Sequence, residues 1–103
     1  MSVKIDLNKI YIPSEKIIAR HIEDDLIIVP VEAGTGTVDF DESLYSLEGT
    51  GREIWEKLKT KTNVEILCSQ LADEYDAPLD TIIKDVTELL TELLIKGLIV
   101  ESR

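Results

Sequence analysis

The chain has 103 residues, of which 44% are hydrophobic and 31% charged, and its formal net charge at pH 7 is −10. A chain of this length fits one domain that can bury a core without disulfides, and the composition is typical of a soluble globular protein. The excess of acids disfavours nucleic acid and anionic membranes as partners, because binding to either requires clustered Lys and Arg. It suits a protein partner or a basic peptide, or it only maintains solubility.

The sequence carries no targeting signal that we can identify. No apolar run approaches the length of a membrane span. The first ten residues, MSVKIDLNKI, lack the basic and apolar regions of a signal peptide. The single cysteine, Cys68, excludes an internal disulfide and agrees with a reducing compartment. We therefore expect a cytoplasmic protein.

The N-terminal third predicts strands. Residues 1–13 are predicted to form an extended lead-in that lies on a domain comprising residues 14–103. The segments KIIARHI at 16–22 and DLIIVPVE at 25–32 are rich in β-branched residues and are separated by an acidic turn. This pattern predicts an antiparallel hairpin. Pro30 cannot donate a ladder hydrogen bond, so we expect it at a strand end or on an edge.

A glycine-punctuated joint follows the next predicted strand. The segment AGTG at 33–36 predicts a loop, residues 37–40 extend the strand pairing, and the third strand is predicted at 44–47. Beyond Gly49 and Gly51, apolar residues recur with helical spacing. We predict a helix from Gly49 to about Lys59, with Trp55 in the core.

Two further helices are predicted. Residues 62–65, TNVE, match a capping box, which predicts that the second helix starts there with the Thr62 hydroxyl as cap. Its inward stripe comprises Val64, Leu67, Cys68, Leu71 and Tyr75. Residues 76–78 end this helix, and Asp80 is the predicted N-cap of the next, which stops at Gly97.

The third helix has a broad apolar stripe formed by Ile82, Ile83, Val86, Leu89, Leu90, Leu93 and Leu94. Its centre, Val86, Leu90 and Leu93, should face the core, which leaves Ile82 and Leu89 along a margin that meets a strand or a partner. Residues 98–100 predict a short terminal strand. The order predicts an α+β winged helix-turn-helix: an N-terminal three-stranded antiparallel sheet, three helices and a short C-terminal strand.

Groups suited to catalysis are scarce. His21 is the only histidine and lies in a predicted strand without the spacing of a metal site, and Cys68 lies on a core stripe. The two Gly-Thr-Gly segments lack the continuation of a phosphate-binding loop. We therefore predict no enzyme activity, metal or cofactor. A winged helix also raises DNA binding, but the third helix carries four acids against two bases on its polar positions, which disfavours contact with phosphates.

A resemblance to a known family rests on two stretches, LYSLEGTGREIWEKL at 44–58 and TNVEILCSQLADEYDAPLDTIIKDVTELLTELLIKGLI at 62–99. In order and spacing they resemble the PqqD-like proteins, peptide chaperones that are also called RiPP recognition elements. The resemblance covers about residues 14–100. One departure is Glu48, where the family commonly has Asn, so we expect Gly49 or Thr50 to replace the usual cap of the first helix.

The resemblance implies a non-catalytic protein that binds the leader segment of a ribosomally made precursor peptide and presents it to a modifying enzyme, often a radical SAM enzyme. The product would be a pyrroloquinoline quinone (PQQ) precursor or another modified peptide. Carried over by position, the leader would add as a strand beside Leu44, Tyr45, Ser46 and Leu47 and rest on Ile82, Asp85, Val86 and Leu89. Exposed strand edges also permit self-pairing into a homodimer. The alternatives are a DNA-binding regulator, a small enzyme or enzyme subunit, and an unassigned protein-interaction module.

Overall fold

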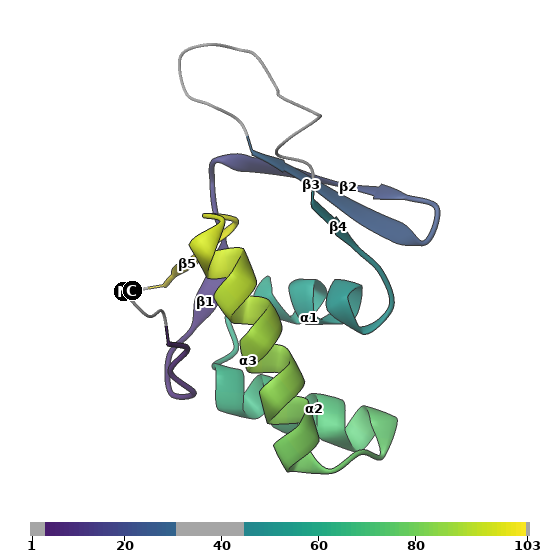
Figure 1. Cartoon of the computed structure of the whole chain (residues 1–103), viewed down its shortest axis with the longest axis vertical. Coiled ribbons are helices and arrows are strands. Elements are labelled where there is room, and N and C mark those ends of the chain that lie inside the picture. The colour runs from purple at the N-terminus through teal and green to yellow at the C-terminus, as the bar shows by residue number, and fades with distance from the viewer. Residues whose placement is uncertain (1–3, 31–44, 103) are drawn as a thin grey trace.

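The computed structural model describes residues 4–30 and 45–102 of the chain. Its elements in chain order are β1 (Tyr11–Pro13), β2 (Ile17–Ile22), β3 (Asp25–Pro30), β4 (Tyr45–Leu47), α1 (Thr50–Leu58), α2 (Val64–Tyr75), α3 (Leu79–Ile95) and β5 (Ile99–Glu101) (Figure 1). This order confirms the predicted α+β class. The loop predicted at 33–36, the extension at 37–40 and the start of the third strand at Leu44 lie outside the described residues.

The main sheet has the strand order β2-β3-β4 and is antiparallel throughout. The hairpin of β2 and β3 is confirmed, and its tip places Glu23 in the left-handed region at φ = 56°. Pro30 is the last residue of β3 and lies opposite Ile17, as expected for a residue that cannot donate within a ladder. Because β3 is central, β2 and β4 are the two edges of this sheet.

A second, two-stranded sheet joins the two ends of the described chain. Strand β1 pairs with β5 in antiparallel register, with Tyr11 opposite Glu101, and the N–H of Ser102 donates to the carbonyl of Ile10 at 2.7 Å. The terminal strand is therefore confirmed. Its partner comes from the segment predicted as an extended lead-in, which also buries Ile5 and Tyr11 in the core.

The joint between β4 and α1 depends on two glycines. Gly49 is the N-cap of α1, with φ = 56° and ψ = −127°, a conformation that is open to glycine and strained for other L-residues. A Cβ on Gly51 would lie 3.1 Å from Cδ2 of Leu47, so Gly51 lets the first turn of α1 approach the strand. Glu48 contributes its carbonyl, which accepts the N–H of Gly51 at 3.1 Å. The expectation that Gly49 or Thr50 replaces the usual cap is thus met by Gly49, without a side-chain hydrogen bond.

Two predicted caps are wrong. The N-cap of α2 is Asn63, whose Oδ1 accepts the N–H of Ile66 at 2.8 Å, while the hydroxyl of Thr62 is hydrogen-bonded to that of Thr60. The N-cap of α3 is Pro78, and Asp80 lies in the first helical turn, where its charge favours the helix dipole without capping it. Both helices begin one or two residues away from the predicted cap.

The helices pack their apolar faces beneath the sheet around a single core (Figure 1). Its fully buried side chains are Trp55, Leu26, Ile28, Leu58, Leu67, Leu71, Leu90, Leu93, Leu98, Ile99, Val64 and Val86. Trp55 and the predicted centre of the α3 stripe are therefore confirmed as core. Cys68 is buried as predicted, and this burial raises the pKa of its thiol to about 11. No helix in the described part of the chain is both long and apolar enough to cross a bilayer.

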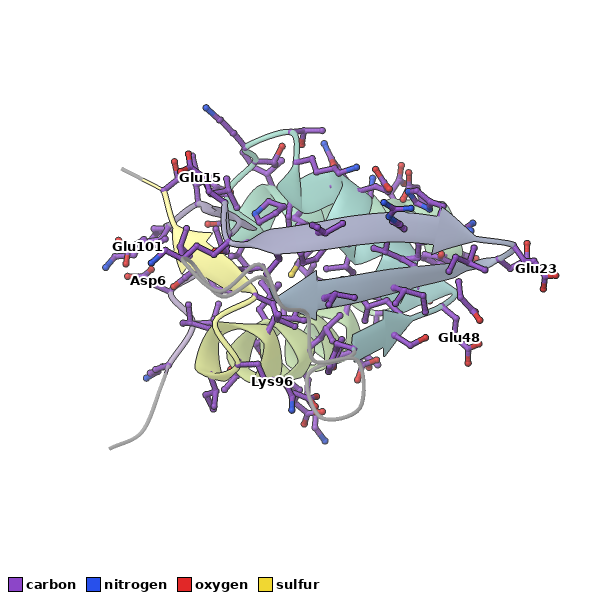
Figure 2. All side chains as sticks on the ribbon, turned by 90° about the horizontal axis from the view of Figure 1, so that it is seen from above. Asp6, Glu15, Glu23, Glu48, Lys96 and Glu101 are labelled. Atoms are coloured by element: carbon purple, nitrogen blue, oxygen red, sulfur yellow. The ribbon has the colours of Figure 1, made fainter. Side chains whose placement is uncertain are left out.

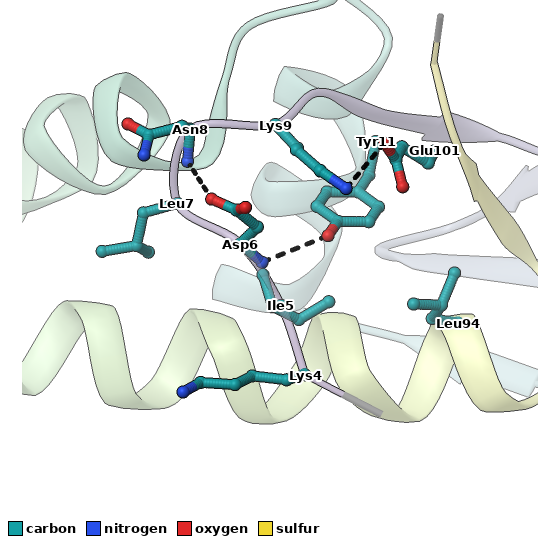
Figure 3. Close-up of a pocket in the computed structure, with 9 residues that line it drawn as sticks. All are labelled: Lys4, Ile5, Asp6, Leu7, Asn8, Lys9, Tyr11, Leu94 and Glu101. Atoms are coloured by element: carbon teal, nitrogen blue, oxygen red, sulfur yellow. Dashed lines mark hydrogen bonds and ion pairs between the residues drawn. The ribbon is translucent and has the colours of Figure 1, made fainter. Parts of the chain in front are cut away.

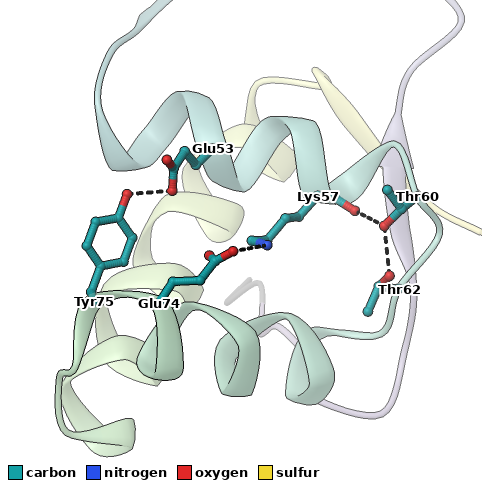
Figure 4. A network of polar contacts seen from close by, with 6 residues as sticks. All are labelled: Glu53, Lys57, Thr60, Thr62, Glu74 and Tyr75. Carbon is teal, nitrogen blue, oxygen red and sulfur yellow. Dashed lines mark hydrogen bonds and ion pairs between the residues drawn. The ribbon is translucent and has the colours of Figure 1, made fainter.

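One residue of the predicted α2 stripe lies outside the core. Tyr75 is 44% exposed, and its hydroxyl donates to the carboxylate of Glu53 in α1 (Figure 4). Lys57 and Glu74 form a second link between the same helices, with Nζ and Oε1 3.3 Å apart. Exposed contacts of this kind contribute little stability, and the two helices are held together mainly by the core residues that they share.

Candidate functional site

Strand β4 is a short edge of the main sheet. Its three residues pair with β3, with Leu47 opposite Leu26, Ser46 opposite Ile27 and Tyr45 opposite Ile28. Among the described residues, β4 has no strand on its other side. An edge strand presents unpaired N–H and C=O groups to any extended chain that lies alongside it. The backbone of β4 can therefore accept one more strand.

One face of α3 forms a wall next to this edge. Asp85, Leu89, Glu92 and Lys96 are spaced at i, i+4, i+7 and i+11, which places them in one row along the helix. Asp85 and Glu92 are exposed, and Leu89 is partly buried against the core. In the view from above, Lys96 lies on the β4 side of the sheet and Glu48 follows the end of β4 (Figure 2).

Tyr45 connects the strand to the wall. The Nζ of Lys96 lies 5.7 Å from the centroid of the Tyr45 ring, within the range of a cation–π contact. Burial raises the pKa of the Tyr45 hydroxyl above its usual value, and the carboxylate of Glu92 adds to this through its charge and a hydrogen bond. These contacts hold β4 against the C-terminal half of α3. The sequence-based prediction of the site did not include Glu92 and Lys96, although their i+7 and i+11 spacing from Asp85 places all three on one face of the helix.

The residues predicted for the site are brought together only in part. Tyr45, Ser46 and Leu47 form β4, while Leu44 lies outside the described residues. On α3, Asp85 is exposed and Leu89 is partly exposed, but Ile82 is only 8% exposed and Val86 only 1%. Val86 therefore supports the wall from the core side, and its side chain offers no surface to a ligand.

The remaining candidate groups for chemistry are occupied elsewhere. The Nε2 of His21 in β2 lies 2.9 Å from Oε1 of Glu56 in α1, so this histidine joins the sheet to a helix. Cys68 is buried and its thiol pKa is raised, which disfavours the reactive thiolate. Residues 4–30 and 45–102 contain no cluster of three or more His, Cys, Asp and Glu that could hold a metal.

A pocket of about 630 Å³ lies away from β4, between the N-terminal segment, α3 and β5 (Figure 3). Several of its polar groups are already paired with one another. The N–H of Asp6 donates to the hydroxyl of Tyr11 at 3.2 Å, and the Nζ of Lys9 lies 3.1 Å from Oε1 of Glu101. This pocket therefore presents few groups to a ligand, and the edge of β4 is the better candidate site.

Comparison with protein families shows which family the chain belongs to. Residues 26–99 match the family described as "Coenzyme PQQ synthesis protein D (PqqD)". The chain belongs to the PqqD family. The match includes β3, β4, all three helices and the start of β5, so it contains the candidate edge and its wall. No curated protein matches the sequence of this PqqD family member significantly.

A solved structure shares the fold of this PqqD family member. It is described as "TbiB1 in Complex with the TbiA(beta) Leader Peptide" and superposes with a TM-score of 0.70. The two sequences are 24% identical, and the similarity covers 85% of this chain and 93% of the other. At this level of identity the likeness establishes the common fold. The resemblance seen in the sequence is thus confirmed for both family and architecture.

Proposed function

We propose that this protein is a non-catalytic peptide chaperone. It binds the leader segment of a ribosomally synthesised precursor peptide by strand addition and presents the peptide to a modifying enzyme of the radical SAM type, in the biosynthesis of PQQ or another modified peptide. The observation that carries the proposal is the edge of β4, which has no further strand beside it among the described residues and contacts the C-terminal end of the row of α3 through Tyr45, Lys96 and Glu92. Membership of the PqqD family and the shared fold with a protein solved in complex with a leader peptide support it.

The two parts of the site have different roles in this proposal. Backbone groups of β4 hold the leader in an extended conformation, whatever its side chains, because main-chain hydrogen bonds do not depend on sequence. The wall on α3 provides selectivity through Leu89, which offers apolar contact, and Asp85, which offers a negative charge. Val86 and Ile82 keep the wall in place from the core side.

Strand addition is tested by modifying the peptide. We would titrate synthetic leaders of precursor peptides encoded in neighbouring reading frames, and then methylate one backbone amide at a time. In an added strand, alternate amides face β4. Methylation should therefore weaken binding at every second position, by about two- to tenfold for each hydrogen bond lost. A uniform response along the peptide would exclude strand addition, and the absence of saturable binding by any leader would exclude the function.

The charge of the wall is tested on the protein. Asp85→Lys replaces an exposed acid of the proposed site, and Asp73→Lys makes the same change at an exposed position of α2 as a matched control. For a leader that carries Lys or Arg, Asp85→Lys should weaken binding several-fold more than Asp73→Lys at low salt, and the difference should shrink at high salt. Equal effects of the two variants would show that only the net charge matters.

A further inference from the structure

Strand β2 is the second edge of the main sheet, opposite β4. It has six residues, Ile17–Ile22, and is paired on one side with β3 in continuous register from Ile17 opposite Pro30 to Ile22 opposite Asp25. Among the described residues it has no strand on its outer side. Natural proteins protect such edges with proline, charged side chains, above all lysine, or bulges. Within β2 there is no proline, no lysine and no bulge, and the exposed Arg20 is the protecting charge that it carries.

The two faces of β2 differ. Ile17 and Ala19 pack against the core, whereas the alternate residues Ile18, Arg20 and Ile22 face outward. Ile18 is 43% exposed and Ile22 is 56% exposed. An edge with two exposed isoleucines on one face and Arg20 as its protecting charge is suited to pairing with another strand.

We propose that β2 pairs with β2 of a second copy of this chain, which joins the two main sheets into one antiparallel sheet of six strands. The inference does not depend on the proposed peptide-binding function. It rests on the edge, on its exposed isoleucines and on the fact that the strand is complementary to itself, as the possible registers show.

The two copies of β2 are related by a two-fold axis perpendicular to the sheet. This axis leaves each side chain on the same face of the sheet in both copies. Directly opposed residues of antiparallel strands also share a face, so a residue cannot lie opposite its neighbour in sequence. One residue must therefore lie opposite its own copy. When that residue is Arg20, Ile18 of each copy lies opposite Ile22 of the other, and Lys16 lies opposite Asp24. The exposed isoleucines then cover one another, and each end of the paired strands gains opposite charges.

The two neighbouring registers are less favourable. When His21 lies opposite its own copy, Ile18 faces Asp24 and Ile22 faces Arg20, so the exposed isoleucines no longer cover one another. When Ala19 lies opposite its own copy, Ile18 faces Arg20, Lys16 faces Ile22, and the two acids Glu15 and Glu23 are opposed. Like charges directly opposite each other destabilise a strand pair. The Arg20-centred register has one such contact, between the two guanidinium groups. On the outward face it is favoured because its other pairs match, while on the core face Ile17 lies opposite Glu23 and Ala19 opposite His21. The contact between the two Arg20 side chains makes a sharp prediction.

Self-association is measured by sedimentation velocity over a range of concentrations. We expect a monomer–dimer equilibrium that shifts toward the dimer with added salt, because each copy has a net charge of −10 and salt screens their repulsion. Ile22→Lys should weaken the dimer by up to about tenfold, because Ile22 occurs in two cross-strand pairs. Arg20→Thr should strengthen it by about two- to fivefold, because it removes the single Arg–Arg pair. Ile66→Lys, at a 48% exposed isoleucine of α2, is the matched control for the added charge and should not weaken the dimer.

Crosslinking tests the register separately. Arg20→Cys should form an intermolecular disulfide under mild oxidation, because the Cα atoms of directly opposed residues lie about 4.5–5.5 Å apart. Ile18→Cys should not, since its two copies would be about 13 Å apart, or four residues along the strand. A protein that remains monomeric at every concentration overturns the proposal. So does a dimer that Ile22→Lys leaves intact, or one in which Ile18→Cys crosslinks and Arg20→Cys does not.

Discussion

The joint between β4 and α1 can be tested by replacing Gly49 with alanine of either hand. At φ = 56° and ψ = −127°, L-alanine is strained, and an added Cβ meets no atom within 4 Å, so the penalty comes from the backbone alone. We expect Gly49→Ala to lower the free energy of unfolding by about 1–3 kcal/mol. Inverting both signs gives φ = −56° and ψ = 127°, an ordinary extended conformation for an L-residue. Gly49→D-Ala should therefore be tolerated, and should raise the free energy of unfolding by about 0.4–1 kcal/mol because it restricts the unfolded chain.

Both variants can be made by peptide ligation and compared by urea and thermal unfolding. In a domain of about 100 residues, each kcal/mol corresponds to a shift of about 4–8 °C in Tm. Glu48→Ala is the matched control, because it changes an exposed neighbour and leaves the carbonyl that binds Gly51 in place. The reasoning is refuted if the L and D variants are equally destabilised, or if Gly49→Ala unfolds at the same temperature as the unmodified protein.

Three further predictions concern stability. Asn63→Ala should cost about 1 kcal/mol by removing the cap of α2, and Thr62→Ala clearly less, as measured by urea unfolding. Leu90→Ala should cost about 2–5 kcal/mol in the same assay, because this side chain is fully buried, whereas Ile95→Ala at a 66% exposed position should have almost no effect. Burial raises the pKa of the Cys68 thiol from its ordinary value of 9.0 to about 11 in the folded protein, so the unfolded chain loses its proton first. The contribution of this thiol to stability is full below pH 9 and is lost as the pH rises through about 11. Between these values the free energy of unfolding should fall more steeply with pH in the unmodified protein than in Cys68→Ala.

Local patterns in the sequence predict much of this fold. The 3.6-residue periodicity of α3 identifies Val86, Leu90 and Leu93 as core because their neighbours along the helix share the same face. The caps are less predictable, since Thr62 and Asn63 are adjacent and both have side chains that can accept an amide hydrogen bond. The motif matched Thr62, and the backbone conformation selected Asn63.

Contacts between distant segments are not encoded in local patterns. The pairing of β1 with β5 joins Tyr11 to Glu101, and neither three-residue strand has a signal that specifies the other. Tyr75 continues the spacing of the α2 stripe but lies at its end, where Glu53 of α1 provides a polar partner. Periodicity alone cannot tell where the core stops.

The sequence predicts a strand edge beside a helix as the candidate site, and the spatial arrangement of the two elements adds details that the sequence does not predict. The same apolar stripe suggested Val86 both for the core and for the ligand, and only its burial decides between them. Lys96 becomes part of the site through its contact with the ring of Tyr45, which depends on how β4 and α3 are placed in space.

The pairing of β1 with β5 has a practical consequence for protein engineering. Because these strands lie side by side, Tyr11 and Glu101 are neighbours, whereas Lys4 lies over α3, on the other side of the pocket (Figure 3). Circular permutation would therefore need a linker that either crosses this pocket to residue 4 or joins residue 102 directly to residue 11, with new ends opened at the tip of the β2–β3 hairpin.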